Sequence, residues 1–67
     1  MANPFALPPG AKLFDVNGVP VVLSPDGTEA LAWDLDPPRQ FPMFSLLSYG
    51  HMISLVDFES LVIGARK

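Results

Sequence analysis

The sequence predicts a small, mainly β fold: a three-stranded meander, then a C-terminal hairpin or long strand, with an extended N-terminal arm. Three observations support this prediction. The pair Asn17-Gly18 separates two apolar runs, residues 24–27 (SPDG) provide a second reversal, and residues 43–63 are rich in Ile, Val and Phe. The alternative is an α+β fold in which residues 43–63 are helical.

The composition predicts one small domain that depends on neighbouring chains. The chain has 67 residues, so we expect a single domain over residues 12–67, preceded by a Pro-rich arm at residues 1–11. It contains no cysteine, which excludes a disulfide framework and thiolate metal sites. Hydrophobic residues make up 49% and charged residues only 16%, whereas about 25% of residues are charged in a typical soluble domain. We therefore expect other protein chains to cover part of the apolar surface.

Residues 1–11 have the composition of an extended arm. Three prolines fix φ and lack an amide donor, so this segment cannot form a central strand. Phe5 and Leu7 alternate along it and could enter pockets on a neighbouring chain. The alternative is a frayed terminus, the common state of such segments.

Residues 12–35 carry the clearest signal, that of a β-meander. Asn17-Gly18 suits a type I′ turn, in which both central residues need positive φ, and it joins KLFDV to VPVVLS. Pro20 lacks an amide, so the second strand should lie at an edge there or leave its amide side unpaired. After the Pro-Asp-Gly turn, residues 28–35 should return as a third strand, with Ala30, Ala32 and Asp34 on one face.

Residues 36–42 (DPPRQFP) are predicted to be a linker. Three of the seven residues are prolines, which disfavour regular strand pairing. The linker separates the meander from the apolar C-terminal segment, residues 43–67.

The C-terminal segment is predicted to form strands at residues 44–49 and 52–63, which flank a two-residue loop at Gly50-His51. Residues of high strand propensity favour this interpretation. The helical alternative would start at Pro42 and stop at Gly64. One continuous helix would, however, spread its polar residues all around the helical wheel and leave no apolar stripe.

No group of residues points to catalysis or to metal binding. His51 is the only histidine and has no nucleophile at a recognisable spacing. Asp34 and Asp36 could share a strand face, but the glycine and the further ligands of an EF-hand loop are missing. Asp57 and Glu59 are interpreted as charges that interrupt an aggregation-prone strand, or as partners for the tail cations. We expect no enzymatic activity, no catalytic or metal site and no cofactor.

The charge pattern disfavours nucleic acid and membrane partners. The formal net charge is −3, and the four basic residues are scattered, so no basic stripe is available for a phosphate backbone or an anionic lipid surface. Residues 42–64 are apolar enough to raise the question of a membrane span. Asp57, Glu59 and His51 fall within that run, which makes a span unfavourable without excluding membrane contact.

These observations favour a non-enzymatic structural subunit of a larger assembly, homo- or hetero-oligomeric. Its concrete version is a virion accessory protein, such as a bacteriophage capsid cement or tail protein. The alternative is a small accessory subunit of a membrane-associated complex. Aromatic and large apolar side chains dominate protein interfaces. The candidate interface residues are Phe5, Leu7, Trp33, Phe41, Phe44, Tyr49 and Phe58.

Overall fold

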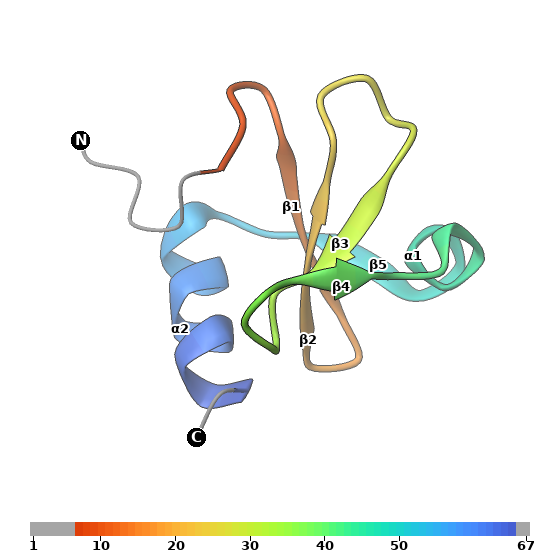
Figure 1. Ribbon diagram of the computed structural model, residues 1–67. Coiled ribbons are helices and arrows are strands. Elements are labelled where there is room, and N and C mark those ends of the chain that lie inside the picture. The colour runs from red at the N-terminus through yellow and green to blue at the C-terminus, as the bar shows by residue number, and fades with distance from the viewer. Residues whose placement is uncertain (1–6, 66–67) are drawn as a thin grey trace.

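Three antiparallel strands form the centre of the structure, a computed structural model that describes residues 7–65 (Figure 1). They are β1 (Lys12–Val16), β2 (Val19–Leu23) and β3 (Ala30–Ala32). Each pairs with the next in sequence, which confirms the predicted meander. The third strand is shorter than predicted, because only three of the eight residues 28–35 pair with β2.

The turn between β1 and β2 has the backbone conformation that the sequence predicted. Asn17 has a φ of 51° and Gly18 a φ of 88°, the sign that a type I′ turn requires at both positions. The Gly18 amide also donates to Asp15 Oδ1 at 2.8 Å. Local backbone geometry and one side-chain hydrogen bond therefore fix the register of β1 against β2.

Pro20 does not lie at a sheet edge, because β2 is the central strand. Instead, the amide side of β2 is left unpaired at this position, as the other alternative predicted. β3 ends at Ala32, so no β3 residue lies opposite Pro20. The Pro20 carbonyl still accepts a hydrogen bond from the Trp33 amide at 2.8 Å. A proline is tolerated in the central strand because the neighbouring strand has stopped.

The Pro-rich segment 36–42 contains a strand that the sequence analysis did not predict. β4 (Arg39–Gln40) pairs antiparallel with β3, with Arg39 opposite Ala32. The prolines surround this pair of residues rather than occupy it, so both residues keep their amides. An edge strand of two residues is compatible with proline neighbours, and the expectation of no regular pairing was wrong here.

The two predicted C-terminal strands are wrong. Residues 43–65 form helix α1 (Met43–Tyr49), strand β5 (Gly50–Met52) and helix α2 (Leu55–Ala65). The supposed hairpin loop Gly50-His51 is itself part of the strand. The chain thus has an α+β fold, closer to the alternative interpretation, although residues 43–63 are not one helix.

The helical wheel failed because it assumed one uninterrupted helix. β5 and the two residues after it separate α1 from α2, so the helical wheel must be drawn for each helix by itself. Within α2 the buried residues Phe58 and Val62 are four positions apart and share one face. The Ser54 hydroxyl accepts a hydrogen bond from the Asp57 amide at 3.2 Å, and this contact caps the start of α2. Asp57 lies in the first helical turn, where a negative charge is favourable.

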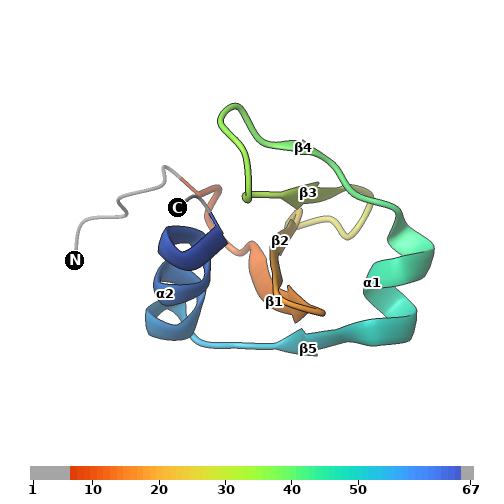
Figure 2. The ribbon, with the colours of Figure 1, turned by 90° about the horizontal axis from the view of Figure 1, so that it is seen from below.

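The five strands form one antiparallel sheet in the order β4-β3-β2-β1-β5. Figure 2 shows α1 and α2 on opposite faces of this sheet. One core, on the α1 face, contains Val16, Val21, Ala30 and Leu46. The other lies under α2. Its buried members are Val22, Phe58 and Val62. The sheet therefore supports two small cores, and β2 contributes consecutive valines to both.

The helices are short. Among residues 7–65, none has both the length and the apolar character that crossing a bilayer would need.

Candidate protein-binding surface

The structure separates the predicted interface aromatics into exposed and buried groups. Phe44 and Tyr49 lie on α1 and are 77% and 55% exposed. Phe58 has no exposed surface and belongs to the core under α2. Phe5 lies outside the described residues. Of the predicted interface aromatics within residues 7–65, Phe44 and Tyr49 are thus the two with a largely exposed ring.

The other three predicted residues are partly buried against the chain's own cores. Leu7 and Trp33 pack on the core under α2, and Phe41 packs on the core next to α1. The Trp33 ring meets Phe58 edge-on, with ring centroids 6.5 Å apart. These side chains therefore pack within the chain itself, and the Trp33 ring covers one side of the buried Phe58 ring.

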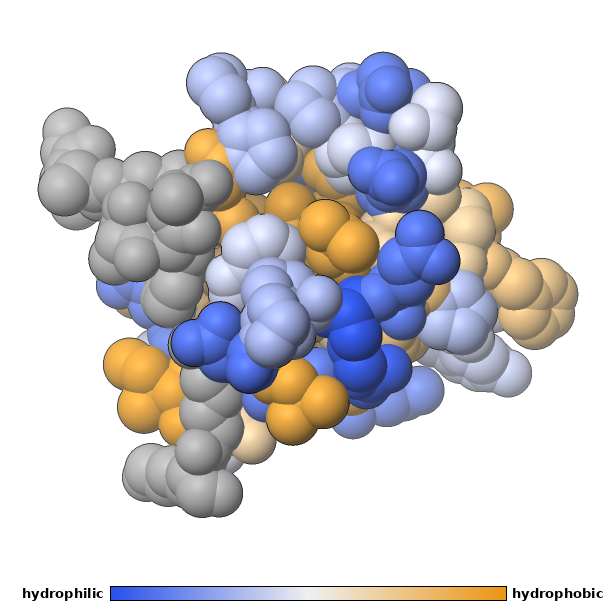
Figure 3. All heavy atoms as spheres, in the orientation of Figure 1, coloured by the Kyte–Doolittle hydropathy of each residue, from blue (hydrophilic) through white to orange (hydrophobic). Residues whose placement is uncertain are grey.

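Sequence reasoning missed two exposed residues that are close to Phe44 and Tyr49 in the sequence. Leu47 on α1 is 77% exposed, and Met52 on β5 is 64% exposed. The other exposed large hydrophobic side chains are spread over α2 and the β3–β4 connection, whereas these four fall within nine consecutive residues. We define Phe44, Leu47, Tyr49 and Met52 as the α1–β5 surface. In Figure 3, hydrophobic side chains also project at the end of the molecule that α1 occupies.

The geometry of α1 explains why its apolar residues are exposed. The helix has only seven residues, and Leu46 is its one buried residue. Phe44 and Leu47 are three positions apart and therefore share a face, which points away from Leu46. The spacing was visible in the sequence, but it could be interpreted only once α1 was known to be a separate helix.

The α1–β5 surface is also uncharged. Residues 40–56 contain no Asp, Glu, Lys or Arg, and their single histidine is His51. Four large apolar groups on an uncharged stretch resemble the core of a protein interface, where charged residues are depleted.

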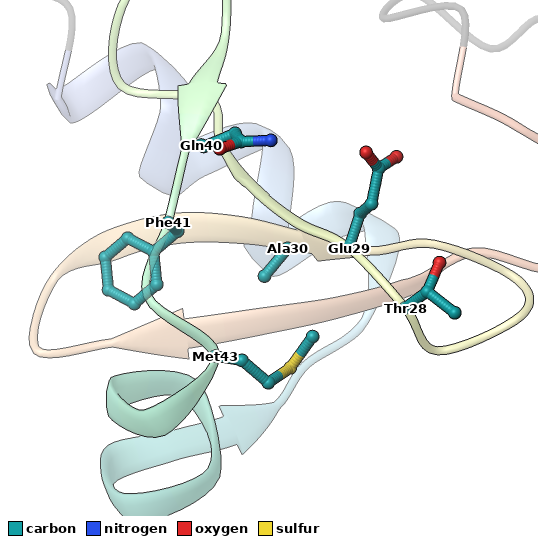
Figure 4. Close-up of a pocket in the computed structure, with 6 residues that line it drawn as sticks. All are labelled: Thr28, Glu29, Ala30, Gln40, Phe41 and Met43. Carbon is teal, nitrogen blue, oxygen red and sulfur yellow. The ribbon is translucent and has the colours of Figure 1, made fainter.

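A small pocket lies between the β2–β3 turn, strands β3 and β4 and the start of α1. Its volume is about 150 Å³, and it is lined by residues from the β2–β3 turn, β3, β4 and the start of α1 (Figure 4). They are Thr28, Glu29, Ala30, Gln40, Phe41 and Met43. The Glu29 carboxylate points away from the Met43 side chain in this view. The volume of the pocket is about that of a cavity that holds one benzene molecule.

Hydrogen bonds in the β2–β3 turn shift the pKa of the Asp26 carboxyl. Asp26 Oδ1 accepts hydrogen bonds from Ser24 Oγ at 2.6 Å, Thr28 Oγ1 at 2.8 Å and the Thr28 amide at 3.1 Å. These bonds favour the charged form and lower the pKa of Asp26 from 3.8 to about 2, with the Ser24 bond as the largest cause. The shift follows from the geometry of the turn.

The remaining candidate acids do not converge on one site. Asp34 Oδ2 accepts a hydrogen bond from Arg39 Nη2 at 2.9 Å, and this contact raises the pKa of Arg39. Asp36 lies in the bend that follows, and Asp57 and Glu59 lie on α2. His51 is exposed on β5, opposite Asp15 in the register. Within residues 7–65, no three His, Asp or Glu residues gather in a way that could hold a metal ion.

Comparison of this chain with known protein families, with curated proteins and with solved structures finds no match.

Proposed function

We propose that this chain is a non-enzymatic structural subunit that binds other protein chains through the α1–β5 surface. One observation carries the proposal: four large apolar side chains are exposed on nine consecutive residues. A small domain gains stability by burying such groups, and leaving them in water is unfavourable. The rest of the chain builds two cores and one sheet that hold α1 and β5 in place.

The energy available on this surface is of the right order for binding. Burying one fully exposed large apolar side chain contributes roughly 1.5–3 kcal/mol. The four side chains are 55–77% exposed, so together they contribute on the order of 4–8 kcal/mol. Association costs about 4–15 kcal/mol in lost motion. The four side chains therefore need to act together, supported by hydrogen bonds at the same surface.

In its specific form, the proposal is an accessory protein of a virion, such as a bacteriophage capsid cement or tail protein. The support for this form is the combination of a 67-residue chain, the lack of cysteine, and an uncharged apolar surface beside a small folded body. Such a chain has no covalent brace and gains stability by assembly.

Site-specific photocrosslinking tests the proposal in the organism that produces the chain. p-Benzoylphenylalanine replaces Phe44 in one variant and Ile63 in the other. Ile63 is the matched control because it is 61% exposed but lies near the end of α2. We expect a discrete covalent adduct with an identifiable protein from position 44 and none from position 63. An absence of adduct at position 44, or equal adducts at both, would contradict the proposal.

A further inference from the structure

Among residues 7–65, no strand pairs with the outer edge of β5. The Ile53 amide donates to the Leu13 carbonyl at 2.9 Å, and the register places these two residues opposite each other. Because hydrogen-bonded pairs alternate along an antiparallel ladder, His51 also faces β1, whereas the amide and carbonyl of Met52 point to the outer edge. The Gly50 carbonyl points the same way.

The two edges of the sheet differ in their protection. β4 carries Arg39 and lies between Pro38 and Pro42, and charge and proline are the usual devices that block pairing at an edge. β5 has the sequence Gly-His-Met, with neither device. It is also flanked by the exposed apolar residues of α1. The asymmetry indicates that β5 is the edge that accepts another strand.

We propose that this strand is β5 of a second copy of the chain, paired antiparallel about a two-fold axis at Met52. This inference rests on the proposed function and names the partner at the same surface. Each Met52 amide then donates to the Met52 carbonyl of the second copy. The sheet becomes continuous across the two copies, with ten strands in place of five.

The register uses the backbone groups that the helices leave available. With Met52 opposite Met52, Gly50 of one copy faces Ser54 of the other. The Gly50 amide already donates to the Leu46 carbonyl, and the Ser54 carbonyl already accepts from the Phe58 amide. The opposite groups, the Gly50 carbonyl and the Ser54 amide, meet across the axis. The pairing is thus self-complementary as a C2 interface requires.

Charge does not oppose the approach of a second copy. Each chain carries a net charge of −3, yet residues 40–56 contribute no charged group. Two copies can approach through this surface with their acidic groups outside it. A basic or acidic partner would find no opposite charge here.

The size of the interface requires α1 to take part. A stable dimer buries about 800 Å² on each partner. The accessible surface of the chain is 4340 Å², so roughly a fifth must be covered, which is more than three residues of β5 can supply. A two-fold axis normal to the sheet keeps both α1 helices on the same face, where Phe44 and Leu47 can add to the contact.

Light scattering after size exclusion tests the dimer on the full chain. The wild type should have twice the 7.3 kDa mass of one chain and should dissociate on dilution. Met52→Pro removes the outward amide without removing a bond to β1 and should halve the mass. Leu47→Asp, which leaves β5 intact, should do the same. Ile63→Asp introduces the same charge on α2 and should remain a dimer.

The outcomes separate the two proposals. A wild type that stays monomeric up to about 1 mM, or forms any oligomer other than a dimer, overturns the inference. A dimer that survives both Leu47→Asp and Met52→Pro also overturns it. If position 44 crosslinks to a different protein while the purified chain is monomeric, the proposed function stands and the self-pairing fails. If Met52→Pro does not fold, as circular dichroism would reveal, Leu47→Asp decides.

Discussion

Replacing Phe58 with alanine is expected to lower the free energy of unfolding by about 3–5 kcal/mol. Phe58 is fully buried between Val22 and Val62, and the Trp33 ring packs against its edge. Truncation removes most of the core under α2 and leaves a cavity that a short sheet cannot collapse around. At about 0.05–0.15 kcal/mol per residue, a chain of 67 residues has a stability on the order of 3–10 kcal/mol, so the variant should be partly or fully unfolded. Urea denaturation followed by circular dichroism measures the loss.

Phe44→Ala is the matched control, since the same side chain is removed from an exposed position. In dilute solution, where the chain is not assembled, we expect its stability to stay within about 0.5 kcal/mol of the wild type. If the two variants lost similar stability, the assignment of Phe58 to the core and Phe44 to the surface would be wrong.

Gly50→Ala is expected to cost about 1–3 kcal/mol, the second largest effect. A Cβ at this position would meet the Leu46 carbonyl oxygen and would lie 2.9 Å from Leu46 Cδ1. The backbone φ is an ordinary −74°, so the cost comes from the close approach of α1 to β5 and not from the dihedral. The chain must shift exactly where α1 turns into the edge strand. Thermal and urea unfolding of the variant measure this effect.

Gly64→Ala provides the control of opposite sign. Nothing lies within 4 Å of a Cβ built at Gly64, which is near the end of α2. Alanine is the better helix former by about 1 kcal/mol, so this variant should be at least as stable as the wild type. A Gly50→Ala variant that behaved like Gly64→Ala would show that α1 and β5 can separate without cost.

The N-terminal half of the fold could be predicted because its signals are local. Asn17 and Gly18 specify the first hairpin. The Ser-Pro-Asp-Gly residues specify the second turn, in which the Asp26 side chain makes local hydrogen bonds. The short strand Arg39–Gln40 escaped prediction because its two residues are surrounded by prolines, although its partner β3 lies only seven to nine residues earlier in the chain.

The C-terminal half could not be predicted because its periodicity changes twice within 23 residues. Met43–Tyr49 and Leu55–Ala65 are helical, but Gly50–Met52 between them is extended and paired with β1. High strand propensity in α2 was overridden by packing of Phe58 and Val62 on the sheet. Tertiary contacts, which no local pattern contains, decided the structure of this segment.

The candidate surface was only partly visible in the sequence. Aromatic content drew attention to Phe44 and Tyr49, but it gave Phe58 equal weight although that ring is buried. Leu47 and Met52 were missed because isolated aliphatic residues resemble core residues. The distinction depends on which face of α1 meets the sheet, and that is a property of the folded chain.

Hydroxyl-radical footprinting of the chain in its native assembly tests the central claim most directly. The reference is the purified chain, diluted until it is a monomer. We expect oxidation at Phe44, Leu47 and Met52 to fall in the assembly, while oxidation at Ile63 stays the same. Equal oxidation of the α1–β5 surface in both samples would mean that no other chain covers it, and would contradict the account.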